Sequence, residues 1–247
     1  MAILLIEFQL VHADILECIF GDVHHWYDAY TCDIKSLDNE NNKKIITAYS
    51  GEHKDHKSNK DVSVIHMRNL NVTFIPENIG LFFNLTSLIV RDSKLIKIRS
   101  KNFIGMSYVE NMDLGGNKLI TIPADAFTKL KKLRYIELSY NQIQEVPNGV
   151  FSNNPDLEII LFSNNKIKFI GSTVFDELYK LDQIKIEGNI CLSKKYNQIK
   201  EINELKTDID LKCKSPNDAI ELKLMEIGTK ISFELDEFKT SFTYCYS

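Results

Sequence analysis

Residues 133–156 read LRYIELSYNQIQEVPNGVFSNNPD, and the spacing of the apolar side chains in this stretch decides the fold. Three neighbouring segments, 85–108, 109–132 and 157–180, share its length of 24 residues and its pattern. Four blocks in register indicate a repeat architecture, in which no single coil buries its own apolar face and the coils therefore stack. The recurring apolar positions are 1, 4, 6, 11, 14 and 19, which in the quoted block are Leu133, Ile136, Leu138, Ile143, Val146 and Phe151.

The start of each block, with the pattern L-x-x-L-x-L, predicts a short strand whose positions 4 and 6 point into the core. Phenylalanine at position 19 then closes the core on the opposite side. Position 9 is polar, and a buried amide there can bond backbone groups that a bent chain leaves unpaired. With a partial unit before the four blocks and a truncated one after them, we expect about six coils over 62–190. The expected asparagine ladder consists of Asn117, Asn141, Asn165 and Asn189, with Ser93 at the same position of the first block.

The composition of the chain narrows the possible functions. It has 247 residues, a formal net charge of −4, 44% hydrophobic and 26% charged residues, which are values of a globular protein. The mild acidity argues against a nucleic-acid partner, since such proteins usually carry a basic excess. The motifs of serine hydrolases, nucleotide-binding loops and zinc proteases are absent from the sequence, so we expect no enzyme and no cofactor.

One histidine pair could be read as a metal site. His53 and His56 stand three residues apart, but in a polar segment with no clear third ligand. We therefore favour a solvated loop and expect no metal. For the segment His24-His25-Trp26-Tyr27 we also expect no metal, but here we interpret the side chains as packing within an N-terminal cap.

The five cysteines all lie towards the two ends of the chain. None forms the tight C-x-x-C pair that is typical of zinc sites. Two pairs flanking a cysteine-free middle fit disulfides in a secreted protein. Cys245 is then left over, which suggests an intermolecular bond; a third intrachain contact and a free thiol are the alternatives.

The N-terminus also favours secretion. Residues 1–13 contain an apolar run and end in a possible cleavage site after Ala13, although Glu7 interrupts the run and no basic residue precedes it. The alternative is a buried N-terminal helix or strand. No segment reaches the ~20 apolar residues of a membrane span. In an exported chain the sequons at Asn71 and Asn84 would accept glycans.

The repeats over about 62–190 resemble the leucine-rich repeat family, in its 24-residue extracellular type. The resemblance implies an α/β fold: a curved solenoid with a parallel sheet on its concave face, closed by cysteine-bearing caps. It implies an N-terminal cap within 14–61 and a C-terminal cap over 191–214, with free buried thiols as the alternative. The disulfides implied by these caps are Cys18–Cys32 and Cys191–Cys213.

The C-terminal region changes character. Tyr196, Ile199, Ile202 and Leu205 show helical spacing. Residues 215–247 predict an amphipathic helix followed by a tail. That helix either docks on the last coil or mediates association with a partner, and in the second case two Cys245 thiols could meet in a homodimer.

The residues on the concave face can be predicted from the register. Positions 3 and 5 flank the inward positions, so their side chains point to the open side. Tyr135, Ile159 and Leu161 then form an apolar, partly aromatic patch, with Asp113 and Glu137 at its border; Ile89 shares position 5. Such patches often mark interfaces, unless the C-terminal helix or a second copy covers them.

These observations predict a secreted recognition module that binds a protein or glycan and does no chemistry. The chain resembles secreted leucine-rich repeat proteins of insects, among which the leucine-rich immune molecules of mosquitoes act in innate immunity. Its helical tail is shorter, and it lacks their adjacent pair of cysteines. A self-associating structural or adhesive matrix protein is the alternative, and an intracellular repeat scaffold would require the absence of a signal peptide.

Overall fold

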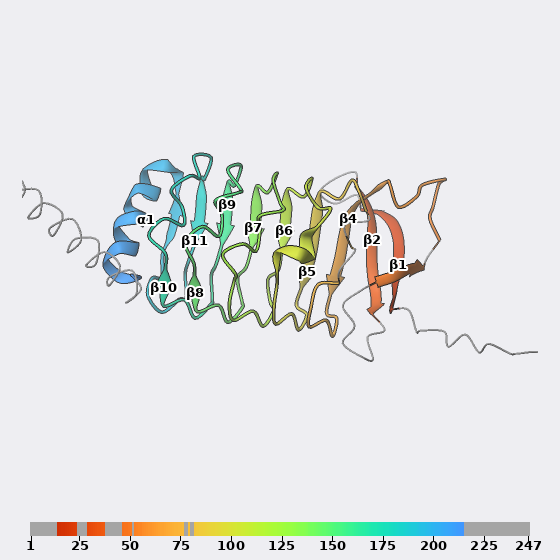
Figure 1. The fold of residues 1–247 in the computed structure, drawn as a ribbon, viewed down its shortest axis with the longest axis horizontal. Coiled ribbons are helices and arrows are strands. Elements are labelled where there is room, and N and C mark those ends of the chain that lie inside the picture. The colour runs from red at the N-terminus through yellow and green to blue at the C-terminus, as the bar shows by residue number, and fades with distance from the viewer. Residues whose placement is uncertain are drawn as a thin grey trace, which may run out of the picture.

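The computed structural model describes residues 14–23, 29–37, 46–50, 52–76, 79 and 82–214. The expected signal peptide, the cluster at 24–27, the amphipathic helix over 215–247 and Cys245 lie outside these residues. The described part forms one long sheet of ten strands with helix α1 (Gln198–Lys212) at its C-terminal end. Figure 1 shows the strands side by side in a single row along the molecule.

Six parallel strands in the middle of the sheet come from the repeats. Each residue pairs with the residue at the same block position in the next coil: Asn111 with Tyr135, and Tyr135 with Ile159. The predicted register is therefore confirmed. The strands are β4 (Val62–Arg68), β5 (Ser87–Arg91), β6 (Asn111–Asp113), β7 (Tyr135–Glu137), β9 (Ile159–Leu161) and β11 (Gln183–Lys185).

The remaining sides of the coils contain little regular structure. β8 (Glu145–Val146) and β10 (Phe169–Ile170) pair in a separate two-stranded sheet, and η2 (Ser100–Phe103) is a short 3-10 helix. All six predicted apolar positions of the four blocks are buried, at 5% exposure or less. Phe103, Phe127 and Phe151 stack from coil to coil, with ring centroids 6.1 and 5.7 Å apart. The core is thus one continuous column under the sheet.

The asparagine ladder joins each coil to the one before it. The amide nitrogen of Asn141 donates to the carbonyl of Leu114 in the preceding coil at 2.9 Å and to that of Leu138 in its own coil at 3.1 Å. Its amide oxygen accepts from the backbone nitrogen of Leu119 at 3.0 Å. Because the side chain is buried, these bonds replace the water that the bent backbone would otherwise need. The same pattern occurs at Asn117, Asn165 and Asn189.

Two further buried amides were not predicted. Asn102 donates to the carbonyl of Ile75, and Asn154 donates to those of Phe127 and Leu130. Both connect a coil to its predecessor on the side away from the sheet. They occupy different block positions, so no periodic signal in the sequence could have shown them.

Position 8 of every coil has a left-handed backbone, with φ between 51° and 72°. Only glycine adopts this conformation without strain, and asparagine and aspartate tolerate it better than other residues. Tyr140 is the one residue of the six that is not glycine, asparagine or aspartate, and it is 62% exposed. The six residues are Asn69, Asp92, Gly116, Tyr140, Asn164 and Gly188.

The N-terminal cap is an antiparallel hairpin that extends the sheet. β1 (Asp14–Val23) pairs with β2 (Ala29–Leu37), which continues in parallel to β4, and Cys18–Cys32 links the two hairpin strands. β3 (Ile46–Ser50) pairs in parallel with β1 and forms the edge strand of the sheet. The predicted N-terminal disulfide is confirmed.

The segment that contains His53 and His56 is an irregular loop with exposed residues, as predicted, but the His53 ring itself is partly buried. The ring stacks on Phe20 with a centroid distance of 3.9 Å, and its two nitrogens bond the Tyr30 hydroxyl and the Asn59 amide oxygen at 3.1 and 2.9 Å. The ring therefore packs against the cap, and the tyrosine and asparagine occupy both nitrogens. In the described part of the chain, no three potential metal ligands gather.

The C-terminal cap closes the other end of the core. β12 (Lys195–Asn197) pairs antiparallel with β11, α1 follows it, and the predicted Cys191–Cys213 disulfide is confirmed. Leu205 and Ile209 of α1 are buried. Tyr196 belongs to the strand rather than to the helix that its spacing suggested, and its hydroxyl donates to Asp208 at 2.6 Å. Among the described helices, none has the length and apolar composition of a membrane span.

Replacing Asn141 with leucine tests the ladder. We expect the free energy of unfolding to fall by about 1–3 kcal/mol for each buried backbone group left unpaired. Gln144→Ala is the matched control, because Gln144 is exposed three residues along the same coil, and we expect a change within about 0.5 kcal/mol. Urea denaturation followed by circular dichroism measures both.

Replacing Tyr140 with asparagine tests the strain at position 8. Asparagine is better tolerated in the left-handed region, so the variant is expected to gain up to about 1 kcal/mol of stability and to melt at a higher temperature. The reciprocal variant, Asn164→Tyr, places tyrosine at the same position of the next coil and is expected to melt lower. Calorimetry of the two proteins checks the pair of signs; equal melting points would contradict the assignment.

Candidate functional site

The side of the sheet that faces away from the core presents two rows of side chains, which we call the open sheet face. Strand pairing aligns each row across the coils, since residues two apart on a strand share a face. The position-3 row is Val64, Ser87, Asn111, Tyr135, Ile159 and Gln183. The position-5 row is His66, Ile89, Asp113, Glu137, Leu161 and Lys185.

The structure brings the predicted apolar residues together in the middle of this face. Tyr135 pairs with Ile159 and Glu137 with Leu161 on adjacent strands β7 and β9. Tyr135 and Ile159 are partly exposed, whereas Leu161 is 9% exposed. Burial, followed by the nearby carboxylates of Glu137 and Asp113, raises the pKa of Tyr135 to about 12. Its hydroxyl therefore keeps its proton at physiological pH and can donate a hydrogen bond.

The two predicted carboxylates differ in their surroundings. Asp113 accepts a hydrogen bond from the guanidinium of Arg91 at 3.0 Å and another from the backbone nitrogen of Gly115 at 2.9 Å. Glu137 accepts from the backbone nitrogen of Ser139 at 2.6 Å, and no ion pair of Glu137 is present in the described part of the chain. Glu137 is only 9% exposed. Burial raises the pKa of Glu137, with Asp113 adding to the effect and Ser139 and Arg91 opposing it.

A third row, at position 7, contains residues that contact the two carboxylates and that the sequence analysis did not consider. Arg91 stands there in the first block, Gly115 in the second and Ser139 in the third. A Cβ atom at Gly115 would lie 3.1 Å from Asp113 Oδ1 and 3.3 Å from Glu137 Cγ. Gly115 is itself buried, and the absence of a side chain there allows the two carboxylate side chains to pack this closely against its backbone. The interval between Arg91 and Asp113 also separates Gly115 from Glu137. This repeated interval is the sequence signal that could have shown that Glu137 lacks the position-7 cation that Asp113 has.

The ends of the open sheet face carry different charges from its centre. At the N-terminal end, His66 Nδ1 lies 2.6 Å from the carboxylate of Asp33 on β2. At the C-terminal end, Lys185 pairs with Lys195 across β11 and β12. Within the position-3 and position-5 rows, carboxylates occur only at Asp113 and Glu137, in the middle of the face next to the apolar patch. Ile89, also predicted for this face, lies on β5 beside Asp113.

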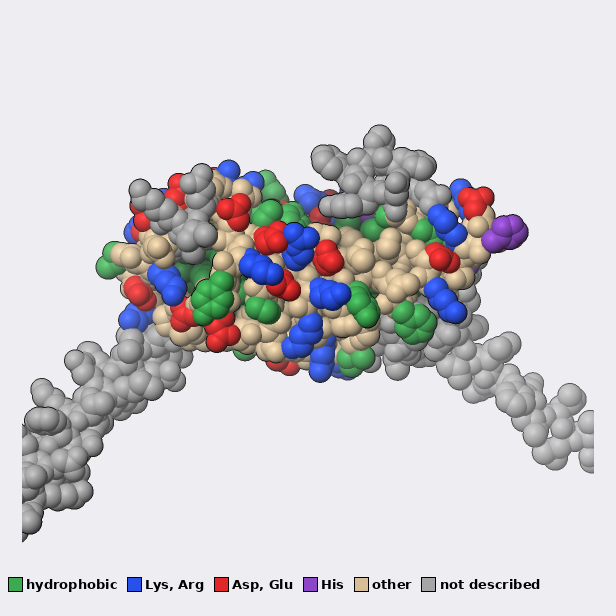
Figure 2. Space-filling model, turned by 90° about the horizontal axis from the view of Figure 1, so that it is seen from above, with side chains coloured by type: hydrophobic (Ala, Val, Ile, Leu, Met, Phe, Trp, Pro, Cys, Tyr) green, Lys and Arg blue, Asp and Glu red, His purple; other side chains and the backbone are tan. Residues whose placement is uncertain are grey.

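The edge at which the strands begin is also strongly charged, but its charges are paired. Arg134 contacts Glu158 at 2.8 Å and Glu110 at 3.7 Å, and Lys180 contacts Asp156 at 2.6 Å. Figure 2, which looks onto this edge, shows acidic and basic side chains intermixed over the central coils. These exposed pairs connect consecutive coils and leave little net charge for a ligand.

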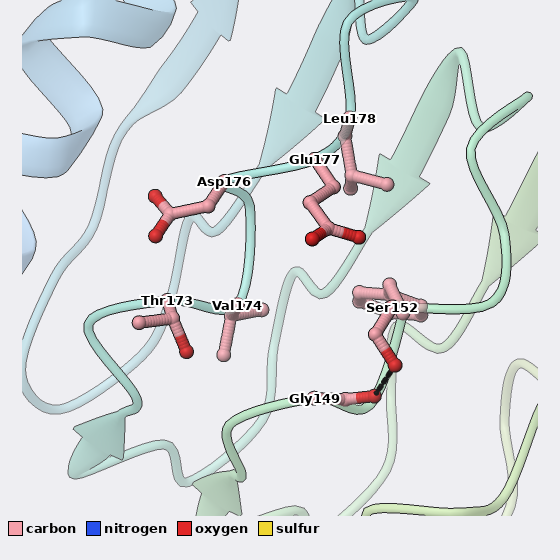
Figure 3. A pocket seen from close by; sticks show the side chains of 8 residues that line it. Gly149, Ser152, Thr173, Val174, Asp176, Glu177 and Leu178 are labelled. Atoms are coloured by element: carbon pink, nitrogen blue, oxygen red, sulfur yellow. Dashed lines mark hydrogen bonds between the residues drawn. The ribbon is translucent and has the colours of Figure 1, made fainter.

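A cavity of about 260 Å³ lies between the third and fourth blocks, on loops away from the sheet. Its apolar lining comes from the core residues Phe151, Val174 and Leu178. Figure 3 shows the carboxylates of Asp176 and Glu177 pointing in different directions at its rim. Asp176 is paired with Lys206 of α1. Because its polar groups do not converge, we regard the cavity as a gap between two coils.

The two sequons lie on either side of the first coil. Asn71 follows the end of β4 by three residues, and Asn84 precedes β5 by three; both side chains are exposed. Asn84 donates through its amide nitrogen to the carbonyl of Lys60 at 2.8 Å. A glycosylated amide retains one N–H, so this bond is compatible with a glycan. Neither residue belongs to the open sheet face.

Comparisons with known proteins identify the repeats. Residues 83–143 and 136–190 match the family model described as leucine rich repeat, and no curated protein matches the chain. Among solved structures, the leucine-rich repeat ectodomain of the receptor kinase SOBIR1 from Arabidopsis thaliana is similar. It is 19% identical, with 70% of this chain and 78% of that chain covered and a TM-score of 0.41. The family match and the strand register together show that the repeats of this chain have the leucine-rich repeat fold.

Proposed function

We propose that this chain is an extracellular recognition module that binds a protein or glycan partner through its open sheet face and does no chemistry. The observation that carries the proposal is the patch on β6, β7 and β9, where Tyr135, Ile159 and Leu161 lie beside Asp113 and Glu137. Partly exposed aromatic and aliphatic side chains with a polar border are typical of protein interfaces. Leucine-rich repeat proteins are generally binding modules rather than enzymes.

Several features support an extracellular location. The disulfides Cys18–Cys32 and Cys191–Cys213 fit an oxidising compartment. The expected signal peptide over 1–13 and the exposed sequons at Asn71 and Asn84 agree with it. Glycans at the edges of the first coil would leave the patch on the later coils accessible.

The resemblance to insect leucine-rich immune molecules supports a role in innate immunity as a more specific form of this proposal. The alternative is a structural or adhesive matrix protein that self-associates. Its support comes from the odd Cys245 and the amphipathic pattern over 215–247, both outside the described residues. In that case a second copy of the chain would cover either the helix predicted over 215–247 or the open sheet face.

Truncation of Tyr135 tests the proposed face. Extracellular fluid is passed over immobilised wild-type chain and over Tyr135→Ala and Tyr179→Ala variants, and the retained proteins and glycans are compared. Tyr179 is the control because it is 82% exposed and lies off the open sheet face. We expect the Tyr135→Ala variant to bind its partner at least tenfold more weakly, since central interface tyrosines often contribute about 2 kcal/mol. The Tyr179→Ala variant should bind like the wild type.

Sedimentation of the same proteins distinguishes the alternative. If the chain is a recognition module, Tyr135→Ala changes partner binding and leaves the sedimentation coefficient unchanged. If the face joins two copies, Tyr135→Ala converts a dimer to a monomer. Equal retention of every ligand by both variants would contradict the proposed face.

Processing provides a separate test of location. After expression in a eukaryotic secretory system, we expect the chain in the medium, with an N-terminus near Asp14 and glycans on Asn71 and Asn84. Mass spectrometry before and after enzymatic deglycosylation measures all three. Asn71→Gln and Asn84→Gln should each remove one glycan. Secreted protein with an intact Met1 and bare asparagines would refute this prediction.

A further inference from the structure

We propose that the open sheet face selects its partner through a lysine or arginine side chain that pairs with Glu137. The inference rests on the proposed function and adds to it the chemistry of the contact. Because lysine and arginine are side chains of proteins, this inference narrows the proposed partner from a protein or glycan to a protein.

The first step is the isolation of the Glu137 carboxylate. Glu137 is 9% exposed, and among the described residues no cation lies within 4 Å of its oxygens. Arg91, on the other side of Asp113, is engaged at 3.0 Å by Asp113 and at 3.4 Å by Asp92. A nearly buried charge without a partner is costly, because the protein replaces only part of its hydration. A cation supplied by another molecule would compensate for that loss.

The second step is a comparison of adjacent coils. Arg91 at position 7 of one coil pairs with Asp113 at position 5 of the next. One repeat further along, the equivalent residues are Gly115 and Glu137. Glu137 therefore occupies the same place in its coil as Asp113 does in the coil before, but Gly115 has no side chain that could pair with it. The Cβ position at Gly115 is only 3.3 Å from Glu137 Cγ, so the glutamate packs closely on the glycine and a cation would have to approach its carboxylate from the solvent side of the open sheet face.

The third step concerns the side chains that neighbour Glu137 on the open sheet face. Tyr135 precedes Glu137 by two residues on β7, so both side chains emerge on the same face, and Leu161 pairs with Glu137 from β9. Lysine and arginine carry long apolar stems that pack on such surfaces, while an aromatic ring attracts their charged ends. The nearest lysine of the same row, Lys185, is two strands away on β11. A basic side chain is thus matched in charge and in shape, whereas an acidic one would be repelled by Glu137 and Asp113.

A random 12-residue peptide display library is selected on the wild-type chain, and a selected peptide is then titrated by calorimetry. We expect the selected peptides to be enriched in arginine or lysine. The affinity should fall at least tenfold with Glu137→Gln and remain unchanged with the control Glu145→Gln, whose exposed residue lies on β8 in the separate small sheet. Replacing the critical arginine of the peptide with uncharged citrulline should weaken wild-type binding but leave Glu137→Gln almost unaffected, since the two groups act as a pair.

Two further variants separate recognition from folding. Glu137→Gln should melt no lower than the wild type at neutral pH, because it removes a desolvated charge and keeps an acceptor for Ser139. Gly115→Arg should supply a cation to Glu137 from within the chain and abolish peptide binding. The backbone at Gly115 is not in the left-handed region, but the new Cβ atom would lie 3.1 Å from Asp113 Oδ1 and 3.3 Å from Glu137 Cγ, so both side chains must shift slightly and the melting temperature of the variant is measured alongside its binding.

The outcomes distinguish the two proposals. Selected peptides without basic enrichment that still require Tyr135 would overturn the pairing with Glu137 and leave the proposed face intact. Peptides that bind equally to the wild type and to Tyr135→Ala would overturn both. Binding of basic peptides that is unaffected by Glu137→Gln would also refute the inference.

Discussion

The buried amide at position 9 is the interaction on which the rest of this structure depends. A coil of 24 residues has to bend several times, and each bend leaves backbone groups facing an apolar core. The amides of Asn117, Asn141, Asn165 and Asn189 satisfy these groups in their own coil and in the coil before. The stacked phenylalanines and the aligned strands follow from the spacing that these amides impose. The regular sheet face therefore depends on the asparagine amides that are buried in the core beneath it.

The caps solve a different problem, because the first and last coils lack a neighbour. At the N-terminal end, an antiparallel hairpin held by Cys18–Cys32 continues the sheet, and Phe20, Tyr30 and His53 cover the core with stacked rings. At the C-terminal end, β12 reverses the strand direction and α1 lies over the last coil, fixed by Cys191–Cys213. Both solutions bury apolar surface without adding another repeat.

The sequence predicted what is periodic and missed what depends on contacts between distant segments. The strand register, the ladder and both disulfides could be read from spacing and from the family resemblance, because stacking converts a fixed interval into a contact. The position of His53 could not be predicted from the sequence, since Phe20 and Tyr30, which it contacts, belong to a hairpin with no repeat pattern. The burial of Glu137 was also missed, because it depends on neighbouring side chains as well as on its own position. The lack of a position-7 cation for Glu137 could have been predicted, because Gly115 is offset from Glu137 by the same interval that separates Arg91 from Asp113.

The ladder is not uniform along the chain, and this has a consequence for how the molecule comes apart. Position 9 is Leu70 in the first coil and Ser93 in the second. The Ser93 hydroxyl accepts a hydrogen bond from the backbone nitrogen of Leu70 in the preceding coil and donates one to the carbonyl of Arg91 in its own coil, whereas the amides of later coils also donate to a carbonyl of the preceding coil. In a linear array each coil is held only by its neighbours, so local differences in coupling are not averaged over the whole domain. Opening should therefore begin in the coils that contain Leu70 and Ser93 and spread towards the asparagine-rich coils, which would exchange their amide hydrogens last. The hairpin disulfide and any sugars at Asn71 and Asn84 lie at this weaker end, where they would oppose the opening most.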